Sequence, residues 1–118
     1  MKLKVSILAL LLGGSALLAG SGDVNGVYKS KINKGTLDVA MMSPYKIKIS
    51  IDSMGSGGNM CTVEGVAILD GNKAVYKDDD DHKIEMTFKG SNVVVSTDSE
   101  SAFCGMNAYI NGTYKKSK

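Results

Sequence analysis

Hydrophobic and polar residues alternate along most of the chain after residue 22. In residues 45–52 every odd position is apolar and every even position is polar, and residues 83–88 repeat the pattern. Such alternation places one face of a strand in a core and the other in water. Similar segments predict further strands at residues 27–32, 37–41, 61–69, 73–76, 92–96 and 106–115.

Short segments rich in Gly and Asn separate the predicted strands. These residues adopt the positive φ that tight hairpins require. They mark turns at residues 33–35, 43–44, 55–58, 70–72 and 89–91. About eight short strands without a helical period predict one all-β antiparallel meander, folded as a small barrel or a compact sandwich.

The first 21 residues follow a different pattern. Lys2 and Lys4 precede an apolar run over residues 5–12, and small residues follow as far as Ser21. This order is typical of a secretory signal peptide, and the apolar run is too short to span a membrane. We therefore predict cleavage after Ser21, a mature domain of residues 22–118, and a periplasmic or secreted location.

The chain has two cysteines, Cys61 and Cys104. In an oxidising compartment such a pair is expected to form a disulfide. A redox pair or a set of metal ligands is the alternative, although the chain has no Cys-x-x-Cys and no histidine close to Cys61. We predict a Cys61–Cys104 disulfide that stabilises the domain by about 4 kcal/mol.

Charge and composition narrow the expected partners. The whole chain has a formal net charge of +2, but the signal peptide carries two of its lysines, so residues 22–118 are balanced. The chain also has no arginine and no tryptophan. Nucleic-acid binding requires a basic surplus, usually with arginine. We expect no nucleic-acid partner, no membrane partner after signal removal, no cofactor or metal, and a monomer or homodimer.

Four consecutive acidic residues form the most conspicuous motif. They are Asp78, Asp79, Asp80 and Asp81. Mutual repulsion requires them to be exposed, and we place them at a hairpin tip. A calcium loop would space its ligands and include a glycine at the bend, which this run lacks. We interpret the run as a solvated acidic turn; alternatively, the run and the adjacent Lys77 form a site that steers a cationic partner.

The sequence contains no recognisable catalytic constellation. His82 is the only histidine, and no Gly-x-Ser-x-Gly motif accompanies it. A triad would need an activated hydroxyl or thiol beside the imidazole. Two carboxylates could converge as in glycosidases, but small meanders rarely form the cleft that this chemistry needs. We therefore expect a protein that is not an enzyme.

Two similar pentapeptides lie near the ends of the mature chain. Residues 25–29 are Asn-Gly-Val-Tyr-Lys, and residues 111–115 are Asn-Gly-Thr-Tyr-Lys. We interpret the similarity as coincidence. The alternative is that the first and last strands occupy equivalent positions in the sheet.

The C-terminal part of the chain, residues 61–116, resembles small exported β proteins of Gram-negative bacteria. The resemblance lies in residues 88–90 and 93–95, the Cys104-Gly105 pair and the final Gly-x-Tyr strand at residues 112–116. Some of those proteins resemble periplasmic lysozyme inhibitors. The chain lacks the Ser-Gly-Ala-Arg-like loop and the following tryptophan of the c-type inhibitors, so no inhibitory residue can be transferred.

These observations favour an exported, non-enzymatic binding protein. The resemblance implies an inhibitor of lysozyme or of another peptidoglycan hydrolase, and such a cationic enzyme would meet the acidic run. The alternative hypothesis is a periplasmic carrier that holds a small ligand or a metal inside the barrel.

Overall fold

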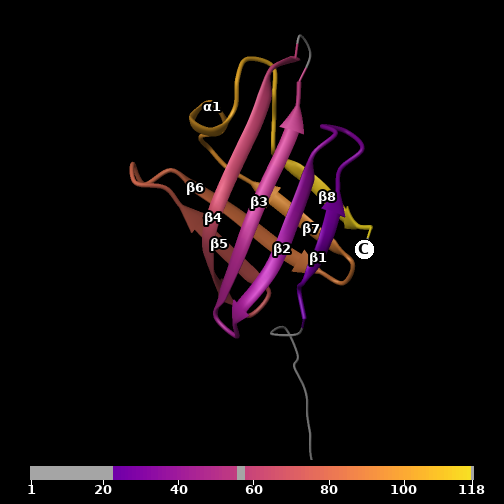
Figure 1. The fold of residues 1–118 in the computed structure, drawn as a ribbon, viewed down its shortest axis with the longest axis vertical. Coiled ribbons are helices and arrows are strands. Elements are labelled where there is room, and N and C mark those ends of the chain that lie inside the picture. The colour runs from indigo at the N-terminus through magenta and orange to yellow at the C-terminus, as the bar shows by residue number, and fades with distance from the viewer. Residues whose placement is uncertain (1–22, 56–57, 118) are drawn as a thin grey trace, which may run out of the picture.

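The computed structural model describes residues 23–55 and 58–117. The predicted signal peptide lies outside these residues, so its cleavage stays a prediction. Eight antiparallel strands follow one another around a closed barrel, and the last strand pairs with the first (Figure 1). They are β1 (Gly26–Lys29), β2 (Thr36–Ser43), β3 (Lys46–Met54), β4 (Met60–Asp70), β5 (Lys73–Lys77), β6 (Lys83–Lys89), β7 (Asn92–Ser96) and β8 (Gly112–Lys116). The all-β meander is confirmed, and it closes as a barrel.

Two of the predicted strands are too long, and one short helix was not predicted. β1 ends at Lys29 because residues 31–33 form a turn. Residues 106–111 are irregular, and β8 begins only at Gly112. The helix α1 (Glu100–Phe103) spans four residues and closes with a hydrogen bond from the Cys104 amide to the Glu100 carbonyl. Four residues are too few to produce a helical hydrophobic period in the sequence.

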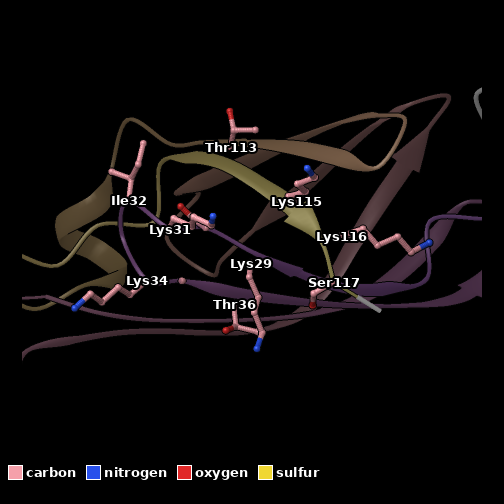
Figure 2. Close-up of a pocket in the computed structure, with 11 residues that line it drawn as sticks. Lys29, Lys31, Ile32, Lys34, Thr36, Thr113, Lys115, Lys116 and Ser117 are labelled. Atoms are coloured by element: carbon pink, nitrogen blue, oxygen red, sulfur yellow. The ribbon is translucent and has the colours of Figure 1, made fainter.

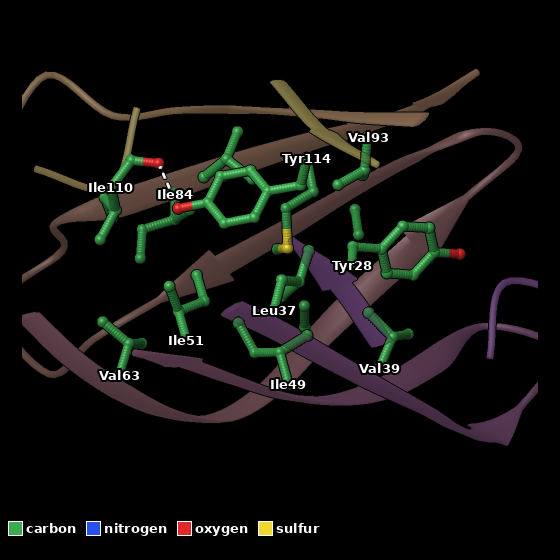
Figure 3. Packing of buried hydrophobic residues seen from close by; sticks show 14 of the residues in the cluster. Tyr28, Leu37, Val39, Ile49, Ile51, Val63, Ile84, Val93, Ile110 and Tyr114 are labelled. Atoms are coloured by element: carbon green, nitrogen blue, oxygen red, sulfur yellow. Dashed lines mark hydrogen bonds between the residues drawn. The ribbon is translucent and has the colours of Figure 1, made fainter. Parts of the chain in front are cut away.

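The inward-facing residues of the alternating strands form one continuous core. Ile47, Ile49 and Ile51 of β3 have no accessible surface. Figure 3 shows Ile49 and Ile51 in the core together with Leu37 of the adjacent strand β2 and Ile84 of β6. A side chain that lines a water-sized cavity would retain accessible area. These residues retain none, so the barrel interior around them is filled with side chains.

An aromatic cluster completes the barrel where β4 and β5 separate. β4 pairs with β3 from Met60 to Ile68, but with β5 only at its last three residues. Tyr76 and Phe103 pack edge to face beside this gap, with ring centroids 6.3 Å apart. A Cβ atom on Gly65 would lie 2.5 Å from the Tyr76 ring, so the glycine makes room for the ring.

The predicted disulfide is present and ties the residue that follows α1 to the start of β4. Cys61 and Cys104 are bonded across 43 positions of sequence. Beside them, the Gly105 amide donates to the Met60 carbonyl at 2.9 Å, and the Asn59 side chain donates to the Met106 carbonyl at 2.8 Å. The disulfide indicates an oxidising compartment outside the cytoplasm.

The two similar pentapeptides occupy equivalent positions, which corrects their interpretation as coincidence. Each begins a strand at the β1–β8 junction, and each asparagine side chain caps the neighbouring strand. The Asn25 Oδ1 accepts the Met41 amide at 2.6 Å, and the Asn111 Oδ1 accepts the Thr97 amide at 2.7 Å. In both cases the donor lies two residues beyond the one paired with the following glycine. The shared sequence therefore builds the same local structure twice.

Candidate functional site

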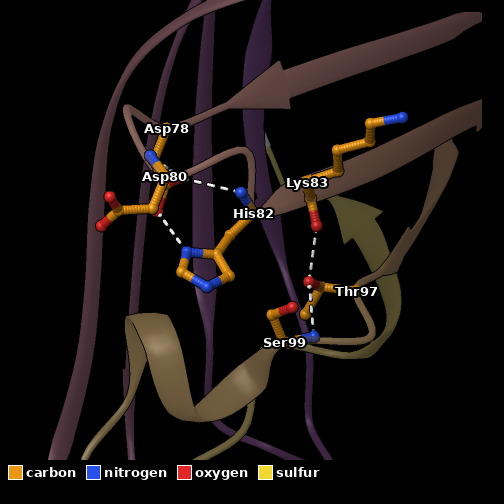
Figure 4. Close-up of polar contacts among 6 residues, drawn as sticks. All are labelled: Asp78, Asp80, His82, Lys83, Thr97 and Ser99. Carbon is orange, nitrogen blue, oxygen red and sulfur yellow. Dashed lines mark hydrogen bonds and ion pairs between the residues drawn. The ribbon is translucent and has the colours of Figure 1, made fainter.

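The acidic run lies in the connection between β5 and β6, as predicted (Figure 4). The turn is closed by the Asp78 amide, which donates to the His82 carbonyl at 3.0 Å, and by the Asp81 amide, which donates to the Asp78 carbonyl at 3.1 Å. Asp79, Asp80 and Asp81 are exposed. We call these three residues the acidic tip.

Asp78 holds the turn together and does not belong to the acidic tip. Its carboxylate accepts the backbone amides of Asp80 at 2.9 Å and of His82 at 2.8 Å, and it contacts the His82 Nδ1 at 2.9 Å. Burial raises the pKa of Asp78, but these hydrogen bonds outweigh it and hold the pKa below its usual value. Sequence reasoning placed all four carboxylates in one class, whereas the structure leaves three of them for a partner.

Lys77 lies beside the tip, with its Nζ 3.9 Å from the Asp81 Oδ1. Both side chains are more than half exposed, so the pair stabilises the turn little. The proximity predicted for Lys77 and the acidic run is present. Lys77 neutralises part of the charge of the tip.

His82 attaches the turn to the body of the barrel. Its ring packs edge to face against Phe103, with centroids 6.2 Å apart. The contact between Asp78 and Nδ1 is the arrangement that orients a general base. However, among the described residues no hydroxyl or thiol hydrogen-bonds to its Nε2. The nearby Thr97 hydroxyl donates instead to the Lys83 carbonyl and accepts the Ser99 amide (Figure 4). The geometry gives His82 a structural role.

Metal-binding clusters and membrane-spanning helices are absent from the part of the chain that the structure describes. Within residues 23–55 and 58–117, no group of three or more His, Cys, Asp or Glu side chains is placed to hold a metal ion. In the same part of the chain, no helix is long and apolar enough to cross a membrane.

A second charged surface lies on the other side of the barrel. In Figure 1 the β5–β6 turn projects at the left, whereas the β1–β2 connection lies at the upper right. There, an open groove of about 790 Å³ runs over β1, β8 and that connection (Figure 2). Five exposed lysines line it, and we call them the lysine groove: Lys29, Lys31, Lys34, Lys115 and Lys116.

The lysine groove was not predicted from the sequence, because only the net charge of residues 22–118 was considered and not its distribution over the surface. Residues 22–118 are nearly neutral, but five lysines lie together along one groove of the barrel. The pairing of β1 with β8 brings lysines from the two ends of the mature chain together. The signal in the sequence was the concentration of lysine in residues 29–34 and 115–118.

Apolar side chains are exposed beside the lysine groove. Ile32 is 93% exposed, and Met54 and Tyr109 are each 54% exposed. These three residues, which we call the apolar rim, line a hollow of about 410 Å³ that shares Ile32 and Lys34 with the groove. The lysine groove and the apolar rim therefore form one continuous surface.

Comparison with known proteins gives no match: no family model, no curated protein and no solved structure is significantly similar to the chain. The resemblance of the C-terminal motif to exported inhibitors stays a prediction from sequence.

Proposed function

We propose that the protein is a periplasmic or secreted, non-enzymatic binding protein that inhibits a cationic protein, with a lysozyme or another peptidoglycan hydrolase as the target. The observation that carries the proposal is the acidic tip, which presents three carboxylates on one tight turn. A concentrated negative charge accelerates encounter with a cationic partner and sets its orientation.

The way the turn is held supports this role. The Asp78 carboxylate binds two backbone amides and the His82 ring, and the ring in turn contacts Phe103. A loop already fixed in its bound conformation loses little conformational entropy when a partner docks. The tip is thus suited to a stoichiometric contact with another protein.

The alternative, a carrier with its ligand inside the barrel, has less support. Side chains that would surround such a ligand, including Ile47, Ile49 and Met86, have no accessible surface. A ligand would have to displace a packed core, which costs several kcal/mol.

The first experiment measures the initial rates of c-type, g-type and i-type lysozymes on cell walls with oxidised protein purified from the periplasm. The tip variant is Asp79→Asn, Asp80→Asn and Asp81→Asn, which leaves Asp78 intact. Asn tolerates the left-handed backbone of Asp81, whose φ is 65°, so the turn should persist.

A control variant removes the same charge from the exposed face of β2, β3 and β4. It carries Asp38→Asn, Asp52→Asn and Glu64→Gln. We expect stoichiometric inhibition of one lysozyme class, weakened in the tip variant and by added salt and retained in the control. Full inhibition by the tip variant would exclude the acidic contact. If folded, oxidised protein inhibits no class, lysozyme is not the target.

A further inference from the structure

We propose that the lysine groove and the apolar rim together form a site that binds the surface of an anionic lipid membrane, with lipid phosphates in the groove and the apolar rim inserted among the acyl chains. The proposal is independent of the acidic tip and of the inhibitor function.

The β1–β8 pair contains an unfavourable pairing of charges. Lys29 of β1 lies directly opposite Lys115 of β8. Like charges in opposing positions destabilise a strand pair. The two side chains diverge across the groove (Figure 2). An anion bound in the groove would offset the charge of either ammonium group.

The protein supplies the groove lysines with little counter-charge: Asp23 lies near enough to Lys116 for their opposite charges to interact, but the two form no ion pair. In the part of the chain that the structure describes, none of the five groove lysines forms an ion pair. Asp52 lies opposite Thr36 at the margin of the groove without pairing with them. Ser30, which also lines the groove, is 5% exposed, and its hydroxyl has no hydrogen-bond partner among the described residues. The site is thus rich in unpaired donors.

The apolar rim distinguishes a lipid surface from a soluble polyanion as the occupant of the site. A polyanion would use the lysines alone, whereas Ile32, Met54 and Tyr109 would stay exposed to water. A membrane interface takes both kinds of group, because lysines pair with headgroups while apolar and aromatic side chains enter below them. Ile32 is 93% exposed on the β1–β2 connection and is the group best placed to enter first. The combination therefore favours lipid.

A lipid partner differs from the sequence-based expectation that the mature protein has no membrane partner, and that expectation stays a prediction. Net charge averages over the surface, whereas a membrane interacts with one face at a time. Screening confines that interaction to about 8 Å at physiological salt, so acidic groups on the other side of the barrel contribute little.

The test is co-sedimentation of the oxidised protein with phosphatidylcholine vesicles, with or without phosphatidylglycerol. The charge variant is Lys29→Gln with Lys115→Gln, and its control is Lys46→Gln with Lys48→Gln on β3. The apolar variant is Ile32→Ser, and its control is Ile68→Ser, at a position 55% exposed on β4.

We expect binding only to the anionic vesicles. Loss of the two groove lysines should weaken the partition coefficient about 25-fold, since each lysine near the surface contributes about fivefold. Ile32→Ser should weaken it roughly tenfold. Both controls should bind like the wild type, and near-ultraviolet circular dichroism should show that every variant is folded.

Three results would overturn the proposal. The first is no binding of the wild type to anionic vesicles, and the second is equal binding to neutral ones. The third is wild-type affinity in Ile32→Ser while the lysine variant fails to bind. In that last case retention on dextran sulfate would identify the groove as a site for a soluble polyanion.

Discussion

Tyr28 and Tyr114 make the same hydrogen bond from equivalent positions on the adjoining strands β1 and β8. Each hydroxyl donates to the backbone carbonyl four residues earlier, that of Val24 or Ile110, at 2.8 Å. Figure 3 shows the bond between Tyr114 and Ile110. Both tyrosines are buried. The arrangement is a tyrosine corner, in which a buried ring fixes the chain that leads into its strand. Two such corners lie at the junction where the barrel closes.

Removal of one corner hydroxyl should lower stability measurably. Tyr114→Phe leaves the Ile110 carbonyl buried without this donor, so we expect the free energy of unfolding to fall by about 1–3 kcal/mol. Urea denaturation measures the change. Tyr45→Phe, at a position 71% exposed, is the control and should stay within about 0.5 kcal/mol of the wild type. Equal effects of the two substitutions would show that the corner contributes nothing.

The same buried phenol should make the fold sensitive to alkali. Burial raises the pKa of Tyr114 more than the hydrogen bond from Asn33 lowers it. Because the folded-state pKa lies above the unfolded one, the folded state resists ionisation. Stability should thus decline as the pH rises above about 10 and through the folded-state pKa. Urea midpoints against pH should fall less steeply in Tyr114→Phe; identical slopes would contradict this account.

The corners also require glycine two residues before each tyrosine. Gly112 has a φ of 148° and Gly26 a φ of 154°, a region that other residues rarely adopt. A Cβ at Gly112 would have room, since its nearest neighbour is 3.7 Å away. Gly112→Ala should therefore cost about 1–3 kcal/mol through backbone strain alone. Thermal unfolding is the measurement, with exposed Thr113→Ala as the control; a neutral Gly112→Ala would refute the strain argument.

Loss of the disulfide should destabilise the whole barrel. It constrains a long loop, and reduction should lower the free energy of unfolding by about 4 kcal/mol. Urea denaturation with and without reductant tests this, and Cys61→Ala with Cys104→Ala should not respond to reductant. Thiol titration of the wild-type protein, unfolded in denaturant without reductant, should find no free thiol. Two reactive thiols would show that the disulfide does not form.

The turn that carries the acidic tip should loosen in acid. The pKa of Asp78 is lowered in the folded state, so its contribution is present above the unfolded value of about 3.9 and is lost as the pH falls through the folded one. The protection of the Asp80 and His82 amides against exchange, taken relative to the intrinsic rate at each pH, should fall below about pH 4. Asp78→Asn should lower this protection at neutral pH, whereas Asp79→Asn should not. Unchanged exchange in Asp78→Asn would contradict the structural role assigned to the Asp78 carboxylate.

The strands could be predicted because their alternation is local. The groove could not, because it depends on which strands meet when the sheet closes, and nothing near Lys29 in sequence indicates that Lys115 lies opposite it. The position of the acidic run in a turn was predicted, but the separate role of Asp78 was not. Whether Asp78 faces inward or outward depends on the conformation of the turn, which four identical residues do not specify. For residues 106–111 the prediction was wrong. Their apolar side chains suggested a strand, but the chain is irregular there.

Closure by β8 has a consequence for the order of folding. During synthesis β1 can pair with β2 early. Its other edge stays unpaired until residues 112–116 have been made, because β8 is the last of the eight strands in sequence. Until then the chain is an open sheet with free edges at β1 and β7, which can pair with other chains. Contacts between sequence-distant strands also form slowly. A chain truncated before Gly112 should therefore accumulate as aggregates rather than as a smaller barrel.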